Sequence, residues 1–245
     1  MDPRVSGKLN PARRFSGALW QHCRTGRLPV IPDIKARSPA EGDLLRGRQP
    51  VEYARTLAAA GAPVLSVVTE PRYFAGSLQL LEMIAASIPL PVLRKDFIDH
   101  EDQLMESRDA GAAAILLIAA RLERRRLFKL IEAALGMGLE PLVEIHRPEE
   151  ITGLRALGLS MLGINNRDIT ALEMDDGSVH TTERLAGLVP AGCLLISESS
   201  LSTPADVKRA SIAGAQAVLV GTALLQADDP AAVYKRLSEV RIGNL

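Results

Sequence analysis

Short apolar segments recur along this chain, separated by stretches of helical spacing, and this alternation restricts the folds open to it. Each segment is a nearly continuous run of valine, isoleucine and leucine. Strands buried on both faces read in this way, and both faces are buried in parallel sheets. We therefore predict eight buried strands, within residues 29–35, 63–70, 91–97, 112–119, 141–146, 161–167, 193–199 and 217–224.

The stretches between the predicted strands carry the end signals of α-helices. Four of them have apolar residues at helical spacing and close on a glycine, as helices often do. Pro148 and Pro204 stand at the start of two of these stretches, where a missing N–H is harmless, and Thr203 is a suitable N-cap. We predict helices within 50–62, 102–112, 148–158 and 204–215, each of which contains one of Gly61, Gly111, Gly158 and Gly214.

The order and spacing of these elements indicate the fold class. The four glycines lie roughly 50 residues apart, which is the length of two β-α units. Eight strands alternating with helices in 245 residues predict an α/β protein, a single (β/α)8 (TIM) barrel over 29–245 with a short N-terminal extension at 1–28. The alternative is an open doubly wound sheet. That fold would place a glycine-rich fingerprint after the first strand, and the sequence has none there.

Composition limits the kinds of binding partner and the cellular compartment that we expect for this protein. Lys+Arg and Asp+Glu both number 29, so bulk charge argues against nucleic acid and a membrane surface as partners. Cys23 and Cys193 are far apart and lack metal-ligand spacing, which favours reduced thiols in a cytoplasmic protein. No apolar run approaches the roughly 20 residues of a membrane span. The first residues also lack the apolar region of a secretory signal.

Polar residues stand at the ends of most predicted strands. In a (β/α)8 barrel these ends surround one mouth, where the active site lies. The fourth strand, 112–119, ends without a charge. The other strands bring to the mouth Asp33, Lys35, Lys95, Asp96, Glu144, His146, Asn165, Asn166, Arg167, Ser197, Glu198, Ser199, Gly221 and Thr222.

Alternation along the strands sorts these side chains by face. If Lys95 and Phe97 face the barrel axis, Asp96 faces the helices, where we expect it to form a structural ion pair. Charges such as Lys35 and Glu144 in an apolar mouth are costly to desolvate unless they serve a site. We expect His146, a lone histidine, to be structural or peripheral.

The segments after the last two strands predict a phosphate site. Residues 197–200 read SESS and residues 220–225 read VGTALL, so both offer small side chains. Loops at these places in barrels bind a substrate phosphate through backbone N–H groups.

Several motifs together resemble one family. The chain is similar to indole-3-glycerol phosphate synthases from about Pro29 to Leu237. The resemblance is carried by IKARSPAEG (34–42), YFAGSLQLL (73–81), VLRKDFI (92–98), LLIAA (116–120), LVEIH (142–146), GINNRDI (163–169), ISES (196–199) and LVGTALLQADDP (219–230). It implies ring closure of 1-(2-carboxyphenylamino)-1-deoxyribulose 5-phosphate with loss of CO2 and water, a step of tryptophan biosynthesis. It implies neither a metal nor an organic cofactor.

The resemblance also implies roles for residues. Lys95 would be the general acid, with a pKa that burial lowers toward neutrality. Glu144 would carry protons in the dehydration, and Lys35, with Arg167 near it, would bind the substrate carboxylate. Asn165 and Glu198 would orient substrate and lysines, and Phe74 and Phe97 would form the walls around the ring. Phosphate or loop positions would be Ser38, Ser199, Ser200, Gly221 and Thr222.

The chain departs from the family pattern at three places. Asp33 stands where the family usually has a glutamate, and Ser200 where it has a glycine. Ser200 would strain the loop unless its φ stays negative. The prefix resembles, at 11–19, only the last part of the amphipathic extension that helps to cover the substrate in the family. The segment 173–185 also looks long.

These departures leave two alternatives. One is a paralogous barrel enzyme on a related phosphorylated sugar, such as an isomerase. An isomerase would need a Cys–Asp pair at the strand ends, but Cys193 begins its strand. The other is a non-catalytic paralogue that binds a phosphorylated ligand or a partner, which would be expected to lose the acid–base positions. As partners we expect a small phosphorylated substrate, and as assembly a monomer or weak homodimer.

Overall fold

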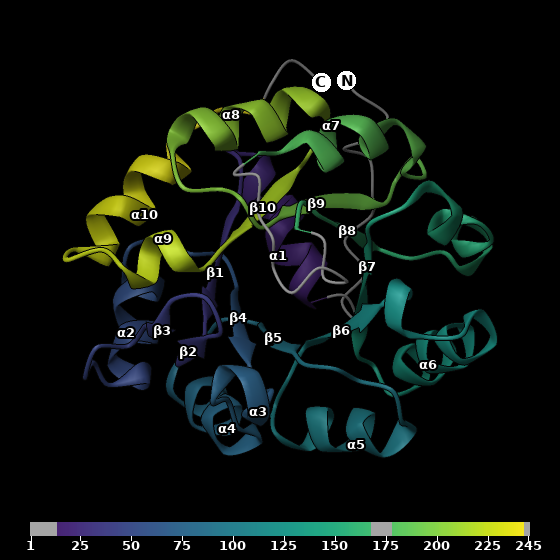
Figure 1. Ribbon diagram of the computed structural model, residues 1–245, viewed down its shortest axis with the longest axis horizontal. Coiled ribbons are helices and arrows are strands. Elements are labelled where there is room, and N and C mark those ends of the chain that lie inside the picture. The colour runs from purple at the N-terminus through teal and green to yellow at the C-terminus, as the bar shows by residue number, and fades with distance from the viewer. Residues whose placement is uncertain (1–13, 168–177, 243–245) are drawn as a thin grey trace.

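The computed structural model describes residues 14–167 and 178–242. In this part of the chain, eight parallel strands close into a barrel in the order β1-β10-β9-β8-β7-β6-β5-β4 (Figure 1). The strands are β1 (Val30–Ile34), β4 (Leu65–Val68), β5 (Val92–Lys95), β6 (Ala114–Ile118), β7 (Glu140–Ile145), β8 (Met161–Asn165), β9 (Leu194–Glu198) and β10 (Ala217–Val220). Each lies within a predicted segment or one residue outside it, so the predicted TIM barrel is confirmed.

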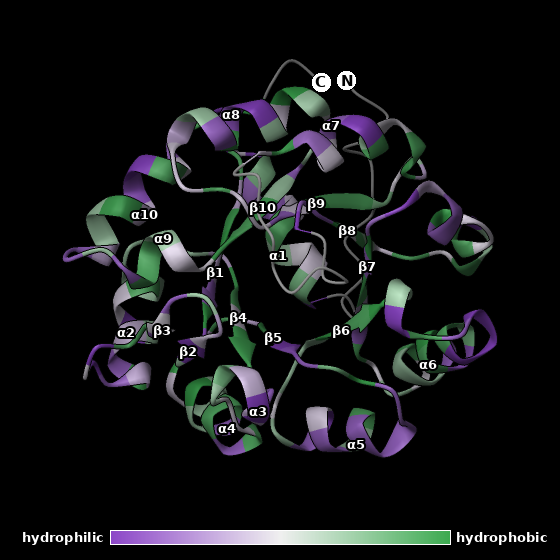
Figure 2. Ribbon diagram, in the orientation of Figure 1, coloured by the Kyte–Doolittle hydropathy of each residue, from purple (hydrophilic) through white to green (hydrophobic). Residues whose placement is uncertain are grey.

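Helices surround the strands and follow them in sequence. They are α2 (Pro50–Ala59), α3 (Pro71–Phe74), α4 (Leu78–Ser87), α5 (Glu101–Asp109), α6 (Arg124–Gly136), α7 (His180–Leu185), α8 (Pro204–Ala213), α9 (Thr222–Leu225) and α10 (Pro230–Ser238). Hydrophilic residues mark their outer faces, while the strands are largely hydrophobic (Figure 2). The short hairpin β2 (Arg37–Ser38) and β3 (Gly42–Asp43) lies between β1 and α2.

The predicted helix ends are largely confirmed. Gly61, Gly111 and Gly214 follow α2, α5 and α8 with positive φ, a conformation open to glycine, and Thr203 caps α8. Two predictions were wrong. Residues 148–158 form two 3-10 turns, η3 (Pro148–Ile151) and η4 (Leu154–Leu157), because Gly153 at φ +87° interrupts the helix between them. The predicted strand 217–224 ends at Val220, where the chain turns into α9.

Apolar side chains fill the lower part of the barrel. The strands direct alternate residues inward, and the inner core includes Ile31, Leu93, Leu116, Leu142, Met161, Leu194, Ile196 and Leu219. Toward the carboxyl ends of the strands, the next inward positions include the charged residues Asp33, Lys95, Glu144 and Glu198, although Ile118 on β6 remains apolar. This order, apolar below and polar above, follows from the two-residue period of a strand and places the charged side chains at one end.

The prefix helix α1 (Arg14–Cys23) closes the amino-terminal end of the barrel. Its Phe15 and Leu19 are fully buried in the inner core. Glu140, the first residue of β7, accepts hydrogen bonds from the N–H of Phe15 at 2.6 Å and from the N–H and hydroxyl of Ser16. The described part of the prefix therefore lies at the end of the barrel opposite the mouth. The predicted division at 28/29 stays a prediction.

Candidate active site

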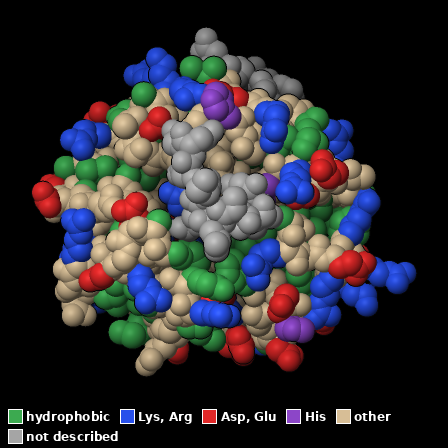
Figure 3. All heavy atoms as spheres, viewed as in Figure 1, with side chains coloured by type: hydrophobic (Ala, Val, Ile, Leu, Met, Phe, Trp, Pro, Cys, Tyr) green, Lys and Arg blue, Asp and Glu red, His purple; other side chains and the backbone are tan. Residues whose placement is uncertain are grey.

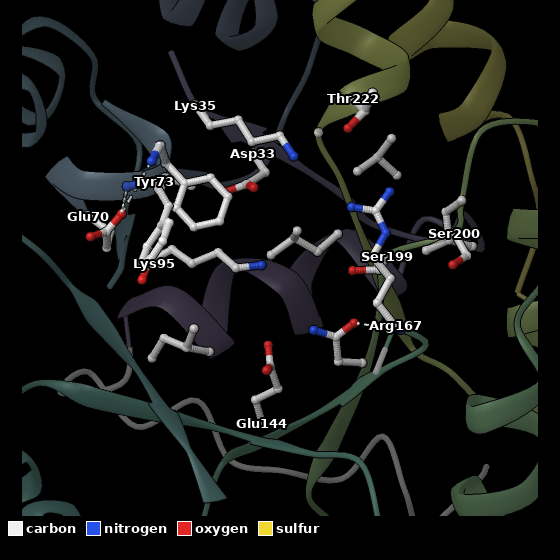
Figure 4. A pocket seen from close by; sticks show the side chains of 18 of the residues that line it. Asp33, Lys35, Glu70, Tyr73, Lys95, Glu144, Arg167, Ser199, Ser200 and Thr222 are labelled. Carbon is white, nitrogen blue, oxygen red and sulfur yellow. Dashed lines mark hydrogen bonds between the residues drawn. The ribbon is translucent and has the colours of Figure 1, made fainter. Parts of the chain in front are cut away.

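A cavity of about 480 Å³ opens at the carboxyl ends of the strands, and all eight strands or the loops after them contribute to its lining. Acidic and basic side chains are interspersed over the face of the molecule seen in Figure 3. Within the cavity, Lys95 and Glu144 point into the same space, while Ser199, Ser200 and Thr222 lie on the side away from Lys95 (Figure 4). The predicted residues that line it are Asp33, Lys35, Phe74, Lys95, Phe97, Glu144, Asn165, Arg167, Ser199, Ser200, Gly221 and Thr222.

Two predicted residues do not line the cavity. Glu198 is fully buried and does not line the cavity itself, but it contacts two residues that do, Lys95 and Glu144. Ser38 is buried in the β2–β3 hairpin, which suits a loop-supporting position better than direct contact with a ligand. His146 lies outside the lining as well, with its Nε2 3.5 Å from Glu144 Oε1.

Lys95 forms an ion pair with Glu198, and their Nζ and Oε2 atoms lie 3.3 Å apart. Burial by itself lowers the pKa of Lys95, but the carboxylates of Asp33, Glu198 and Glu144 outweigh it, and the pKa is raised above its ordinary value. The expectation of a lowered pKa was therefore wrong. That expectation was based on burial among apolar residues and left out the three carboxylates that lie near the ammonium group.

The two glutamates around Lys95 hold their protons more firmly than exposed glutamates do. Burial raises the pKa of Glu198 to about 8, and the Lys95 charge opposes that rise. Burial also raises the pKa of Glu144, again against the attraction of Lys95 and contacts with Asn165 and Glu198. One ammonium group thus shares a desolvated space with two glutamates whose pKa values are raised by burial.

Gly163 makes room for this arrangement. It lies on β8, and a Cβ atom at its position would clash with the Glu198 carboxylate. Sequence reasoning placed this glycine in a motif but did not find its role, because the neighbour that needs the space lies on β9. A glycine on an inward-facing strand position is the signal that could have suggested it.

Asp33 is held on β1 by a neighbouring strand. Its Oδ1 accepts a hydrogen bond from Ser66 Oγ at 2.6 Å, and Asp33 is 6% exposed. On its other side Gly221 lies so close that a Cβ there would contact the Asp33 side chain at 3.3 Å. Contacts with Ser66 and Gly221 therefore hold the Asp33 side chain in place, and its carboxylate acts on Lys95.

Asp96 forms the predicted structural ion pair. Its Oδ2 lies 2.9 Å from Arg94 Nη2 and accepts a hydrogen bond from Thr69 Oγ1 at 2.6 Å. Arg94 is buried and donates in addition to the carbonyl oxygen of Gln103 and the hydroxyl of Ser107 on α5. Because the Arg94 side chain is fixed against α5, the adjacent Lys95 must point the other way, into the cavity.

Glu70 is a residue of the site that sequence reasoning missed. It caps the short helix α3, where its carboxylate accepts hydrogen bonds from the N–H groups of Arg72, Tyr73 and Phe74. This cap places Tyr73 and Phe74 on the cavity wall. An acidic residue directly before Pro71, which begins α3, was the available signal.

The loop after β9 adopts a conformation that serines rarely take. Ser199 and Ser200 have φ of +66° and +57°, so the condition under which we expected Ser200 to strain this loop is met. Asn166 holds this loop, because its Nδ2 donates to Ser197 Oγ and to the carbonyl oxygens of Glu198 and Ser199. This loop lines the cavity at Ser199 and Ser200.

The fourth strand, β6, ends without a charge as predicted, but Arg121, which follows it, brings a charge to the mouth. This arginine ends the turn η2 (Ala119–Arg121) directly after β6, and its side chain lines the cavity. The predicted strand stopped at residue 119, two residues before Arg121.

The described residues contain no group of three or more side chains arranged to hold a metal ion. None of their helices is long and apolar enough to cross a membrane. Part of the predicted long segment 173–185 falls on 173–177, outside the described residues, and the rest leads into α7.

Comparisons with known proteins agree with the family resemblance. The family model described as indole-3-glycerol phosphate synthase matches residues 3–237. A protein of that name from Thermococcus kodakarensis is 43% identical over 87% of this chain and 93% of its own length. Proteins of the same name from Polaromonas naphthalenivorans and Listeria monocytogenes are 42% and 39% identical, over 92% and 94% of this chain and 84% and 89% of their own lengths.

Proposed function

The chain belongs to the indole-3-glycerol phosphate synthase family, and we propose that the cavity at its barrel mouth carries out the reaction of that family. The protein is a decarboxylating lyase. It closes the ring of 1-(2-carboxyphenylamino)-1-deoxyribulose 5-phosphate, with loss of CO2 and then of water, to form indole-3-glycerol phosphate. The ion pair of Lys95 with Glu198, amid two further carboxyl groups, is the observation that supports this placement most directly.

Lys95 is proposed as the general acid. Ring closure forms a bond between the ring carbon that carries the carboxylate and the ketone carbon of the sugar chain, so the ketone oxygen must receive a proton. The surrounding carboxylates keep Lys95 protonated, which a proton donor requires before the reaction begins. Glu198 orients its ammonium group from below and, as a buried neighbour in contact, can replace the donated proton.

Glu144 is proposed to move the protons of the dehydration. Loss of water needs a group that takes a proton from carbon or nitrogen and returns one to the departing hydroxyl. Burial raises the Glu144 pKa, which brings this carboxyl group closer to the pH at which it can both accept and donate. Asn165 lies beside it on β8 and would orient the substrate.

Cations and backbone groups would bind the two ends of the substrate. Lys35 and Arg167 line the cavity and suit the carboxylate, and Asp33 would set the orientation of the lysines. The phosphate would bind at Ser199, Ser200, Gly221 and Thr222, with Ser38 supporting the adjacent loop. Phe74 and Phe97 would enclose the aromatic ring between apolar faces.

The compartment, assembly and binding partners of the enzyme are proposed from its reaction and its charge. It acts on a small phosphorylated substrate, and no bound metal or organic cofactor is needed for this reaction. We infer a cytoplasmic protein that is a monomer or weak homodimer and binds neither nucleic acid nor membranes. A balanced charge of 29 acidic and 29 basic residues supports this inference.

Direct assay tests the proposal. Purified protein is mixed with the carboxyphenylamino-deoxyribulose phosphate, and indole absorbance and fluorescence are followed. A time-dependent rise of the indole signal, slowed when the product is added as a competitor, supports the assignment. Binding of the substrate without indole formation would replace it with a non-catalytic role, and turnover of a different sugar phosphate would replace it with the altered-substrate alternative.

A further inference from the structure

Arg121 occupies a place in the cavity that the proposed roles leave unused. Its guanidinium carbon lies 4.0 Å from the centroid of the Phe97 ring, and both residues line the cavity. Arg121 is exposed. Among residues 14–167 and 178–242, no carboxylate forms an ion pair with it, unlike Lys95, which is paired with Glu198. Arg121 therefore brings to the mouth a positive charge that no described acidic residue neutralises.

The order of the strands places Arg121 opposite the proposed phosphate loops. Arg121 follows β6 and Gly221 follows β10, and these two strands are separated by four steps in either direction around the closed barrel. Phe97 follows β5, the neighbour of β6, and β5 is likewise opposite β9. A substrate whose phosphate binds after β9 and β10 would therefore direct its other end toward Phe97 and Arg121.

A guanidinium stacked on an aromatic ring is suited to bind the carboxylate at the aromatic end of the substrate. Stacking on an aromatic ring uses the weakly hydrated face of the guanidinium and leaves the N–H groups at its edge available. An edge with parallel N–H groups binds a carboxylate with two hydrogen bonds. The far end of the substrate is an aromatic ring that carries a carboxylate next to its nitrogen.

We propose that Arg121 is a substrate-recognition residue that binds the carboxylate of the anthranilate ring while that ring rests near Phe97. This proposal rests on the proposed function. Lys35 follows β1, which pairs with β10, so Lys35 approaches the substrate from the phosphate side. Arg121 approaches from the opposite side, and the two cations together favour rings that carry the carboxylate over rings that lack it.

Two unreactive ligands separate carboxylate recognition from ring binding. One is 1-(2-carboxyphenylamino)-1-deoxyribitol 5-phosphate, in which an alcohol replaces the ketone, and the other is its phenylamino counterpart without the carboxylate. Titration calorimetry gives the Kd of each for the wild type, Arg121→Met and Arg124→Met. Methionine keeps an apolar side chain over Phe97 and removes the charge. Arg124 is a matched control, because it stacks on Phe128 at 5.5 Å and does not line the cavity.

Arg121→Met is expected to weaken the carboxylate ligand about 10-fold, the usual worth of one charge-assisted contact, and to change the other ligand less than about twofold. Arg124→Met should change neither. Equal weakening of both ligands would overturn the proposal, because it would make Arg121 a support for the Phe97 wall, and so would an unchanged Kd. If the wild type binds neither ligand, the proposed function itself fails and this inference falls with it.

Discussion

Lys95 and Glu198 meet at the centre of the barrel, with the lysine Nζ 3.3 Å from a glutamate oxygen that belongs to a fully buried side chain. The pair joins β5 to β9, on opposite sides of the closed sheet. Two further carboxyl groups, those of Asp33 and Glu144, act on the same ammonium group, so three acidic side chains surround one basic side chain. Because these charged groups lie so close together, substitutions among them should change both activity and stability.

Stability should fall as the pH rises through the range in which Glu198 ionises. Its folded pKa of about 8 is above its unfolded value of about 4.3. Its contribution is therefore fully present below about pH 4 and is lost as the pH rises toward 8. Glutamine does not ionise, so Glu198→Gln removes this loss. The difference in unfolding free energy, variant minus wild type, should therefore increase between about pH 5 and pH 8. Urea unfolding at several pH values measures this, and a constant difference would contradict it.

Glu144→Gln should abolish turnover while the ligand still binds. Glutamine keeps the shape of the side chain and removes its titratable proton, so kcat should fall by about 100-fold or more. The Kd of a product analogue should change little. Glu149→Gln, an exposed neighbour on η3, serves as control and should leave kcat unchanged. Full activity of Glu144→Gln would remove this residue from the dehydration.

The amino-terminal end of the barrel should be sensitive to Glu140. Its carboxylate binds the first turn of α1 and Ser160, far from the cavity. Glu140→Ala should lower the unfolding free energy by about 2–4 kcal/mol, because it leaves buried donors without an acceptor. At a temperature where the variant is folded, its kcat should equal that of the wild type. A lower kcat in the fully folded variant would show that α1 influences the site from the opposite end.

Ser200→Gly should stabilise the loop after β9. A serine at φ +57° carries about 1 kcal/mol of strain that glycine does not have. The unfolding free energy should therefore rise by up to about 1 kcal/mol. Ser202→Gly is the matched control, since Ser202 is not among the residues with positive φ, and it should lose about 0.5 kcal/mol through the freedom of the unfolded chain. Destabilisation of both variants alike would argue that Ser200 is unstrained.

Local patterns were sufficient to predict the strands and most of the polar residues around the mouth. The two-residue period placed Lys95 inward and Asp96 outward, and glycines such as Gly111 marked helix ends correctly. These features depend on a few neighbouring residues. Other features depend on segments far apart in the chain, and they were missed: Gly163 is needed by Glu198, and the Lys95 pKa depends on carboxylates from three other strands.

Turns were the second source of error. Arg121 follows its strand by only three residues, yet no pattern in the sequence shows that the chain bends back toward the cavity there. The same holds for Ser200, whose left-handed conformation is set by Asn166 contacts with the neighbouring carbonyl groups and not by its own preference.

Ring closure depends, in the proposed mechanism, on a proton that Lys95 supplies. Single-turnover measurement of indole formation by the wild type and Lys95→Met, with enzyme in excess over the carboxyphenylamino-deoxyribulose phosphate, tests this role of Lys95 most directly. Methionine preserves the length of the side chain and removes the proton donor. The rate is expected to fall by at least about 100-fold, while the Kd of the ribitol analogue should change by less than about tenfold. An unchanged single-turnover rate in a folded variant would contradict this role.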